Sequence, residues 1–326
     1  MKKGGFSVGL VPFFPCGDRF LPTGYRKDKL TLKEKLEKVS EIEDVIAVEL
    51  DYPTDFEDPV KMKTILEQTG LLASNIEIDL FADKKWKYGT LSSRDEKIRQ
   101  EAINLAKRGM DAAALLGNNQ ISLWLGQDGF DYPMQVDYQI YWENTIDAIE
   151  EIGKYREDVK VCIEYKSKEP RVHIQFGTVG KALSIVNSIG LKNIGVLLDV
   201  GHALMAYENP AESAVLLNKY NRLFHIHFND NFDSWDDDLI VGSVHLWETL
   251  ELLYWLEKIN YEGWYSLDIF PYREESLAAI KQSIKNLKTF IEIAEKLDEE
   301  KIYSLQKENN AAGVIEVLRE VVLKQN

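Results

Sequence analysis

The sequence is poor in residue types that several classes of protein require. It has two cysteines, Cys16 and Cys162, which lie far apart and lack the CxxC spacing of a thiolate metal site. Such a chain has no disulfide framework, which fits a reducing compartment, and we expect a cytoplasmic protein. No run of about 18 apolar residues occurs, so no membrane-spanning helix and no membrane partner are expected.

Positive charge is also scarce. The chain has 39 Lys and Arg against 54 Asp and Glu, and its formal net charge is -15. Because an acidic surface repels phosphates and no basic stripe is present, nucleic acid is not an expected partner. No GxGxxG or GxxxxGK(S/T) motif follows the first strand-like run, which argues against a dinucleotide-binding or P-loop fold.

Strand-like apolar runs alternate with helix-like amphipathic stretches along most of the chain. Strands are expected near Phe6–Leu10, Val45–Leu50, Asn75–Leu80, Ile121–Leu125, Val161–Tyr165, Gly195–Asp199, Leu223–Phe228 and Tyr265–Ile269. Helices are expected near Leu32–Ser40, Pro59–Thr69, Ser93–Leu116, Tyr138–Tyr155, Thr178–Ile189, Pro210–Asn218, His245–Ile259 and Glu274–Lys296.

The alternation predicts an α/β fold, a closed (β/α)8 TIM barrel, with an open doubly wound sheet as the alternative. Polar residues end at least five of the strands, which favours the barrel because barrel enzymes carry their chemistry there. We assign residues 1–297 to the barrel and residues 298–326 to a C-terminal helical extension. Two long loops, Lys84–Ser93 and Gly126–Asp137, are of the kind that often covers a site.

Charged residues gather at the ends of strands five to eight. Because strand side chains alternate between faces, Glu164 and Lys166 are expected to point into the barrel together. The same reasoning turns Asp199, His227 and Asp268 inward. Charged groups rarely point into a barrel unless they are paired or bind metal.

The carboxylates of this group need compensating charge. Five of them would repel one another strongly, whereas two divalent cations and one lysine would neutralise them. Oxygen-rich ligands with one or two imidazoles suit Mg²⁺, Mn²⁺ or Co²⁺. The predicted cofactor is therefore a divalent metal, with up to two ions per subunit. The five are Glu164, Asp199, Asp236, Asp238 and Asp268.

Each motif also has a simpler explanation. Glu164-x-Lys166 can be an ion pair, Asp199 can cap a helix, and one histidine of His225-x-His227 can be a core residue. The run from Asp236 to Asp238 can be an acidic surface loop. The functional interpretation rests on all of them occurring in chain order at the ends of successive strands.

The pattern Glu164-x-Lys166, Asp199-x-x-His202, His227, Asp236-x-Asp238 and Asp268 resembles that of the xylose isomerase-like sugar isomerases. The run HFND…WDDDLIVGSVH is most similar to their L-rhamnose isomerase branch. The similarity spans nearly the whole barrel. It implies a small sugar as substrate and, with the helical extension, a homodimer or homotetramer.

The resemblance also implies a role for each matched residue. A first metal would be held by Glu164, Asp199, His227 and Asp268, and a second by His202, Asp236 and Asp238 with Asp199 bridging. Water on the second metal would shuttle a proton, which makes Asp236 and Asp238 catalytic together with Glu164. Lys166 would donate to the sugar carbonyl oxygen, His202 would also face the substrate, and Trp124 would form an apolar wall. His225 would orient a ligand.

The chain departs from the family in its N-terminal half. Many of these isomerases have a histidine there that helps to open the sugar ring, whereas the first histidine of this chain is His173. Asp51, Asp79 or Lys87 could replace it, or the substrate opens readily without such a residue, which argues against an ordinary pyranose aldose such as D-xylose or L-rhamnose.

The sequence favours a metal-dependent aldose–ketose isomerase that moves hydrogen between C1 and C2 as hydride. The alternative is a ketose 3-epimerase, which uses one metal and two carboxylates as acid and base. Lys166 and the Asp236-x-Asp238 motif have no role in that alternative. A dehydratase, a nuclease of abasic sites, and a sugar-binding protein without catalysis remain as further hypotheses.

Overall fold

Eight parallel strands close into a barrel, as the sequence predicts. The computed structural model describes residues 4–15, 17, 20–25, 30–56 and 58–323. Around the barrel the strands follow the order β1-β11-β10-β9-β6-β4-β3-β2. Their bounds are Phe6–Gly9 (β1), Val45–Tyr52 (β2), Leu72–Ile78 (β3), Gln120–Trp124 (β4), Lys160–Glu164 (β6), Ile194–Asp199 (β9), Leu223–Phe228 (β10) and Tyr265–Leu267 (β11).

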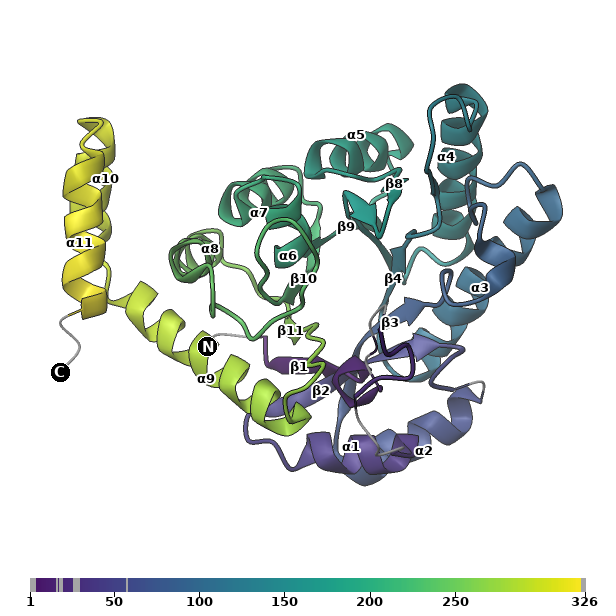
Figure 1. Ribbon diagram of the computed structural model, residues 1–326, viewed down its shortest axis with the longest axis horizontal. Helices are drawn as coiled ribbons and strands as arrows, with labels where there is room; N and C mark the ends of the chain where they lie inside the picture. The colour runs from purple at the N-terminus through teal and green to yellow at the C-terminus, as the bar shows by residue number, and fades with distance from the viewer. Residues whose placement is uncertain (1–3, 16, 18–19, 26–29, 57, 324–326) are drawn as a thin grey trace.

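Helices surround the barrel (Figure 1). Most of them begin after an Asp, Thr or Asn whose side chain accepts a backbone hydrogen bond, as Asp58 does for α2 and Asn209 for α7. Gly70 and Gly190 end α2 and α5 in the left-handed conformation. The bounds are Leu32–Ser40 (α1), Pro59–Thr69 (α2), Glu96–Leu115 (α3), Tyr138–Tyr155 (α4), Val179–Ile189 (α5), Val200–Met205 (α6), Pro210–Lys219 (α7), Leu246–Lys258 (α8) and Ser276–Glu295 (α9).

Because side chains alternate along each strand, some residues of a strand pack in the core while their neighbours face the site. Ile163, Val196 and Ile226 are fully buried and belong to the apolar cluster that joins strands and helices. Burying a side chain of this size contributes about 1.5–3 kcal/mol. Glu164, one residue along β6 from Ile163, lines a cavity at the carboxyl end of the barrel.

Three features of the fold were not predicted. The strand β3 begins at Leu72 rather than near Asn75, because its first residues pair with Ala47 and Val48 of β2. The short helix α6 directly follows β9. A small antiparallel sheet, of two- and three-residue strands too short for a periodic signal, contains β5 (Gly129–Phe130), β7 (Lys168–Glu169) and β8 (Val172–Ile174).

The C-terminal extension forms two helices, α10 (Glu299–Lys307) and α11 (Ala311–Leu323). Figure 1 shows them side by side beyond the end of α9, apart from the ring of helices. A small apolar cluster of Leu297, Ile302 and Val317 joins them to the end of α9. The boundary at residue 297 stays a prediction. Within the described ranges, the helices are too short or too polar to span a bilayer.

Asp128 ties the loop after β3 to the loop after β4. Its buried carboxylate accepts hydrogen bonds from the backbone N–H and the hydroxyl of both Thr90 and Ser92. Its own carbonyl oxygen accepts from Tyr141 and from the backbone of Gln175. One side chain therefore fixes two long loops relative to each other.

We expect Asp128→Ala to lower the free energy of unfolding by roughly 2–4 kcal/mol, because it leaves the buried N–H groups of Thr90 and Ser92 without acceptors. Urea unfolding followed by circular dichroism measures this change. Asp158→Ala is the control, since it removes an exposed carboxylate paired only with Arg156 and should leave stability unchanged. Equal stability of the two variants would contradict the role of Asp128.

Candidate metal centre

A cavity of about 490 Å³ opens at the carboxyl ends of the strands. In a barrel, this is the end at which active sites lie. Asp199 is fully buried and lies directly behind it, in contact with the other residues of the site. The remaining residues predicted for the site line the cavity itself: Trp124, Glu164, Lys166, His202, His227, Asp236, Asp238 and Asp268.

The four residues predicted to hold a first metal lie together. One potential ligand atom from each of Glu164, Asp199, His227 and Asp268 lies within 4.8 Å of the others. The Nδ1 atom of His227 lies 3.4 Å from Glu164 Oε1, 3.6 Å from Asp268 Oδ2 and 3.8 Å from Asp199 Oδ2. This buried nitrogen has no hydrogen-bond partner among the described residues. Such a group fits a divalent cation, which takes ligands at about 2.1 Å.

A second group shares Asp199 with the first. Asp199, His202 and Asp236 offer ligand atoms within 4.8 Å of one another, and His202 Nε2 lies 3.1 Å from Asp236 Oδ2. The other side-chain atoms of these two residues, His202 Nδ1 and Asp236 Oδ1, are buried without a partner among the described residues. This group also has the donor types and the unused atoms that a divalent cation requires.

Asp238 is placed differently from the other three residues predicted for the second metal. It lines the cavity, but its carboxylate accepts a hydrogen bond of 2.9 Å from Asn229 and lies outside both ligand groups. Its backbone has φ +46°, a left-handed conformation that is uncommon for a residue with a side chain. Burial and the charge of Asp236 raise its pKa well above the usual range.

Asp199 also caps a helix, so the simpler explanation of this residue is true as well. Its Oδ1 accepts a 2.8 Å hydrogen bond from the backbone of His202 in the first turn of α6. Its Oδ2 accepts one of 2.9 Å from Asn229. Because a carboxylate oxygen has two lone pairs, each oxygen keeps one for a cation, and the two roles are compatible.

Burial and crowding shift the pKa values of the site. Burial raises the pKa of Asp199 to about 6 and that of Asp268 to about 7. Burial lowers the pKa of His202, but the charges of Asp199 and Asp236 outweigh this effect and bring it to about 9. Near neutral pH His202 therefore holds a proton, Asp268 holds one part of the time and Asp199 less often, and a cation would have to displace these protons.

Lys166 lies between the second ligand group and Trp124. Its Nζ is 2.6 Å from Asp236 Oδ2, also pairs with Glu169, and lies 5.1 Å from the centre of the Trp124 ring. Burial opposes its charge, but Asp236 and Glu169 hold its pKa above the usual range. The lysine is therefore fixed in its charged form between the second ligand group and the aromatic wall.

Two cavity residues were missed in the sequence, Glu49 on β2 and Glu77 on β3. Glu77 accepts hydrogen bonds from Ser122 and from the backbone of Trp124, and burial together with Glu164 raises its pKa to about 8. Glu49 contacts both His225 and His227. The alternation in VIAVELDY, which places Glu49 and Asp51 on one face, is the signal that could have identified this wall.

The three residues that could replace the missing histidine lie in different places in the structure. Asp51 and Asp79 line the cavity, whereas Lys87 does not. The carboxylate of Asp79 already accepts hydrogen bonds from Thr54 and from the backbone of Phe81 and Ala82. Asp51 lines the cavity without such hydrogen bonds to its carboxylate among the described residues.

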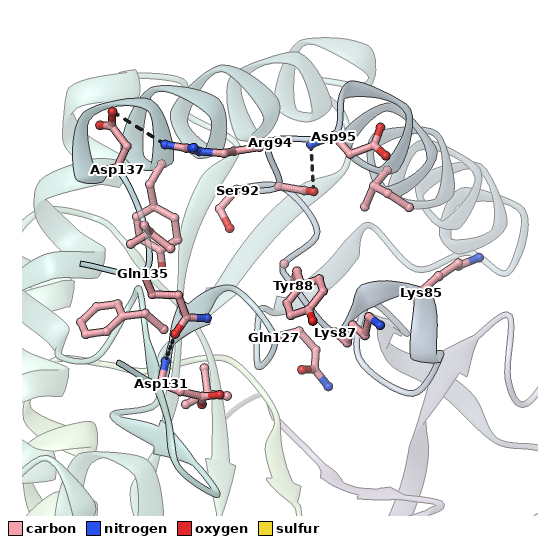
Figure 2. A pocket seen from close by; sticks show the side chains of 18 residues that line it. Lys85, Lys87, Tyr88, Ser92, Arg94, Asp95, Gln127, Asp131, Gln135 and Asp137 are labelled. Carbon is pink, nitrogen blue, oxygen red and sulfur yellow. Dashed lines mark hydrogen bonds and ion pairs between the residues drawn. The ribbon is translucent and has the colours of Figure 1, made fainter. Parts of the chain in front are cut away.

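The two long loops border a hollow of their own. This second hollow, of about 580 Å³, lies between the loops after β3 and β4. Figure 2 shows Lys85 and Lys87 on one side of it and Asp131 and Gln135 on the other. Gln127, which lines this hollow, donates to the carbonyl oxygen of Phe81, which lines the barrel cavity. The described residues of these loops line this hollow and not the barrel cavity, and their role as a cover of the barrel site stays a prediction.

The chain matches a family model described as the xylose isomerase-like TIM barrel, over residues 37–290. The chain belongs to this family. The family membership confirms the superfamily that the motifs indicate, and the L-rhamnose isomerase branch stays a prediction.

Similar proteins of this family include sugar isomerases and epimerases. The xylose isomerase of Thermus thermophilus is 28% identical over 221 residues, which are 66% of this chain and 57% of that protein. The chain thus spans a little over half the length of the curated relatives it matches.

Solved structures share the fold. A D-tagatose 3-epimerase-like protein has a TM-score of 0.69 and 22% identity, with 90% of this chain and 98% of that chain covered. An L-ribulose 3-epimerase has a TM-score of 0.69 and 15% identity, with coverage of 90% and 96%. At these identities the likeness establishes the barrel alone.

Binding of Mn²⁺ to the metal-stripped protein should tighten as pH rises from 6 to 8.5. Protons on His202, Asp268 and Asp199 compete with the cation, and raising the pH removes them. Isothermal titration calorimetry in buffers of different ionisation enthalpy measures both the affinity and the protons released. A pH-independent affinity without proton release would contradict this ligand set.

Proposed function

We propose that the protein is a divalent-metal-dependent sugar isomerase that interconverts an aldose and a ketose. The observation that carries the proposal is the position of Asp199 in both ligand groups, with Lys166 held against the second group by Asp236. Two adjacent cation sites and a charged donor at one cavity wall are what a hydrogen shift between neighbouring carbons requires.

Glu164, Asp199, His227 and Asp268 would hold one cation, and His202 and Asp236 would hold a second with Asp199 shared and Asp238 beside them. Mn²⁺ and Mg²⁺ suit these donors, and Co²⁺ is compatible. When bound, such cations act as Lewis acids on the sugar oxygens at the reacting carbons.

The side chains of the cavity then position the sugar and stabilise charge. In the conversion of an aldose, one hydrogen moves from C2 to C1 while the O2 proton moves to O1, so that C2=O forms as C1=O is lost. Lys166 Nζ would donate to the carbonyl oxygen on which negative charge grows. Trp124, packed edge-to-face with Phe81 at 4.8 Å, forms an apolar wall that excludes water from the reacting carbons.

The charge of the cavity favours a neutral sugar as substrate. Among the described residues that line it, nine are Asp or Glu and one is Lys. The formal charge of the nine carboxylates exceeds that of Lys166 and two divalent cations by about four, and protons on carboxyl groups whose pKa is raised by burial, such as Glu77 and Asp238, reduce this excess. A phosphate or carboxylate on the sugar would meet this excess of negative charge, whereas hydroxyl groups can donate to it.

A ketose 3-epimerase is the second candidate. In its favour, the cavity holds Glu164 and Asp268, two carboxylates that could act as acid and base around one cation. The epimerases among the solved structures share the barrel. Against it, the second ligand group and the buried Lys166 have no part in a reaction at C3.

Asp236→Ala combined with Asp238→Ala should reduce aldose–ketose conversion at least about 100-fold, because it breaks the second ligand group and removes one of the two partners of Lys166. Conversion is measured by NMR in D₂O with a panel of pentoses, hexoses and 6-deoxyhexoses in the presence of Mn²⁺. The control is Asp237→Ala, which changes a neighbouring carboxylate outside the cavity lining.

Full activity of the double variant would contradict the proposal of two cations. Inversion at C3 with solvent deuterium incorporated there, and no aldose–ketose conversion, would assign the protein to the epimerases instead.

Sugar phosphates and uronic acids should react at least about tenfold less efficiently than the matching neutral aldoses, because the cavity repels anions. The comparison uses kcat/KM for each neutral sugar, its terminal phosphate and its terminal acid under the same metal concentration. A phosphorylated sugar that reacts faster than its neutral counterpart would overturn the neutral-substrate assignment and leave the reaction type open.

A further inference from the structure

Glu49 contacts both histidines of β10. Its Oε1 lies 2.7 Å from His225 Nε2, and its Oε2 lies 3.0 Å from His227 Nε2. All three side chains are buried. Because a carboxylate only accepts hydrogen bonds, both contacts require the histidine to carry its proton on Nε2.

These three residues also have the composition of a small metal site, since their ligand atoms lie within 4.8 Å of one another. Their contacts argue for hydrogen bonding instead. Asn75 Nδ2 donates to Glu49 Oε2 at 3.0 Å, on the same oxygen that faces His227. With Asn75 and His227 both directed at Oε2, neither lone pair of this oxygen remains for a cation.

The same amide continues a hydrogen-bonded path across the barrel. Asn75 also donates to Ser122 Oγ at 2.6 Å, and Ser122 donates to Glu77, which accepts from the backbone of Trp124. The path joins strands β2, β3 and β4, so Glu49 is held in place from the side opposite to the histidines. Side chains fixed in this way keep one geometry.

The consequence for His227 follows from its ring. In the neutral ring, a proton on Nε2 directed at Glu49 leaves the lone pair of Nδ1 facing Glu164, Asp199 and Asp268 at 3.4–3.8 Å. The Nδ1 atom is the unpartnered nitrogen of the first ligand group. The opposite tautomer would turn an N–H toward these carboxylates and would remove the nitrogen as a ligand.

We propose that Glu49 is the positioning residue of the metal centre: it selects the His227 tautomer that presents Nδ1 to the cation. The inference rests on the candidate metal centre and not on the reaction catalysed there. A carboxylate that fixes the second nitrogen of a ligating histidine typically changes metal affinity by about 10–100-fold.

Glu49→Gln is the test, since glutamine has nearly the same shape but only one accepting oxygen for two histidines. The Kd for Mn²⁺ of the metal-stripped protein should rise about 10–100-fold. Ser74→Ala is the control, because it removes a buried hydrogen bond on the neighbouring strand that does not lead to the site, and its Kd should not change.

A double-mutant cycle separates positioning from a general loosening of the barrel. If Glu49 acts through His227, the Kd of Glu49→Gln/His227→Asn should equal that of His227→Asn alone. An unchanged Kd in Glu49→Gln, or an equal weakening in both backgrounds, would overturn the proposal.

Nuclear magnetic resonance of the metal-free, ¹⁵N-histidine-labelled protein provides a readout that does not depend on metal. Burial lowers the pKa of His227, but the charges of Glu49 and Glu164 outweigh this effect and raise it well above its usual range, so the spectra are taken at a pH high enough to make the ring neutral. There the wild-type His227 should show the Nε2–H tautomer, and Glu49→Gln should populate Nδ1–H. An Nδ1–H tautomer in the wild type would refute the assignment. Failure of the wild type to bind Mn²⁺ would refute the metal centre itself. The spectrum does not depend on metal, so it distinguishes that outcome from a wrong assignment of the role of Glu49.

Discussion

Repulsion among buried carboxylates is the constraint on which the rest of this structure depends. Glu164, Asp199, Asp236 and Asp268 point into one end of the barrel, with Asp238 beside them. Lys166 and two histidines supply only part of the opposite charge. Burial and this shortage of positive charge raise the pKa values of Asp199 and Asp268, so both carboxylates retain protons more readily. A cation would replace those protons. Metal binding, charge balance and ligand geometry therefore depend on one another in this site.

The barrel and most of the ligand set could be predicted from sequence because both depend on local patterns. Alternation along β6 and β10 turns Glu164, Lys166 and His227 inward, and the alternation of strands with helices identifies the barrel. Short elements could not be predicted, because strands of two or three residues such as β5 and β8 carry no period. The position of Asp238 depends on a left-handed backbone that no pattern in the acidic run reveals.

Contacts between strands that are far apart in the sequence could not be predicted either. Glu49 lies on β2 and meets His225 and His227 of β10 only because the barrel closes. The loops after β3 and β4 looked suited to cover the site, yet Asp128 draws them together around a separate hollow. In both cases the sequence contains the residues, and the pairing is decided by tertiary structure.

The dual role of Asp199 limits how this centre could be redesigned. The same carboxylate holds the first turn of α6, and His202 lies in that turn. Lengthening the residue to glutamate would move its oxygens by one methylene, so the hydrogen bond to the backbone of His202 and the position of the carboxylate in the two ligand groups could not both stay unchanged. The position of His202 would shift with it. A change of metal preference at residue 199 therefore requires a compensating change in the turn that follows, such as a new cap for α6.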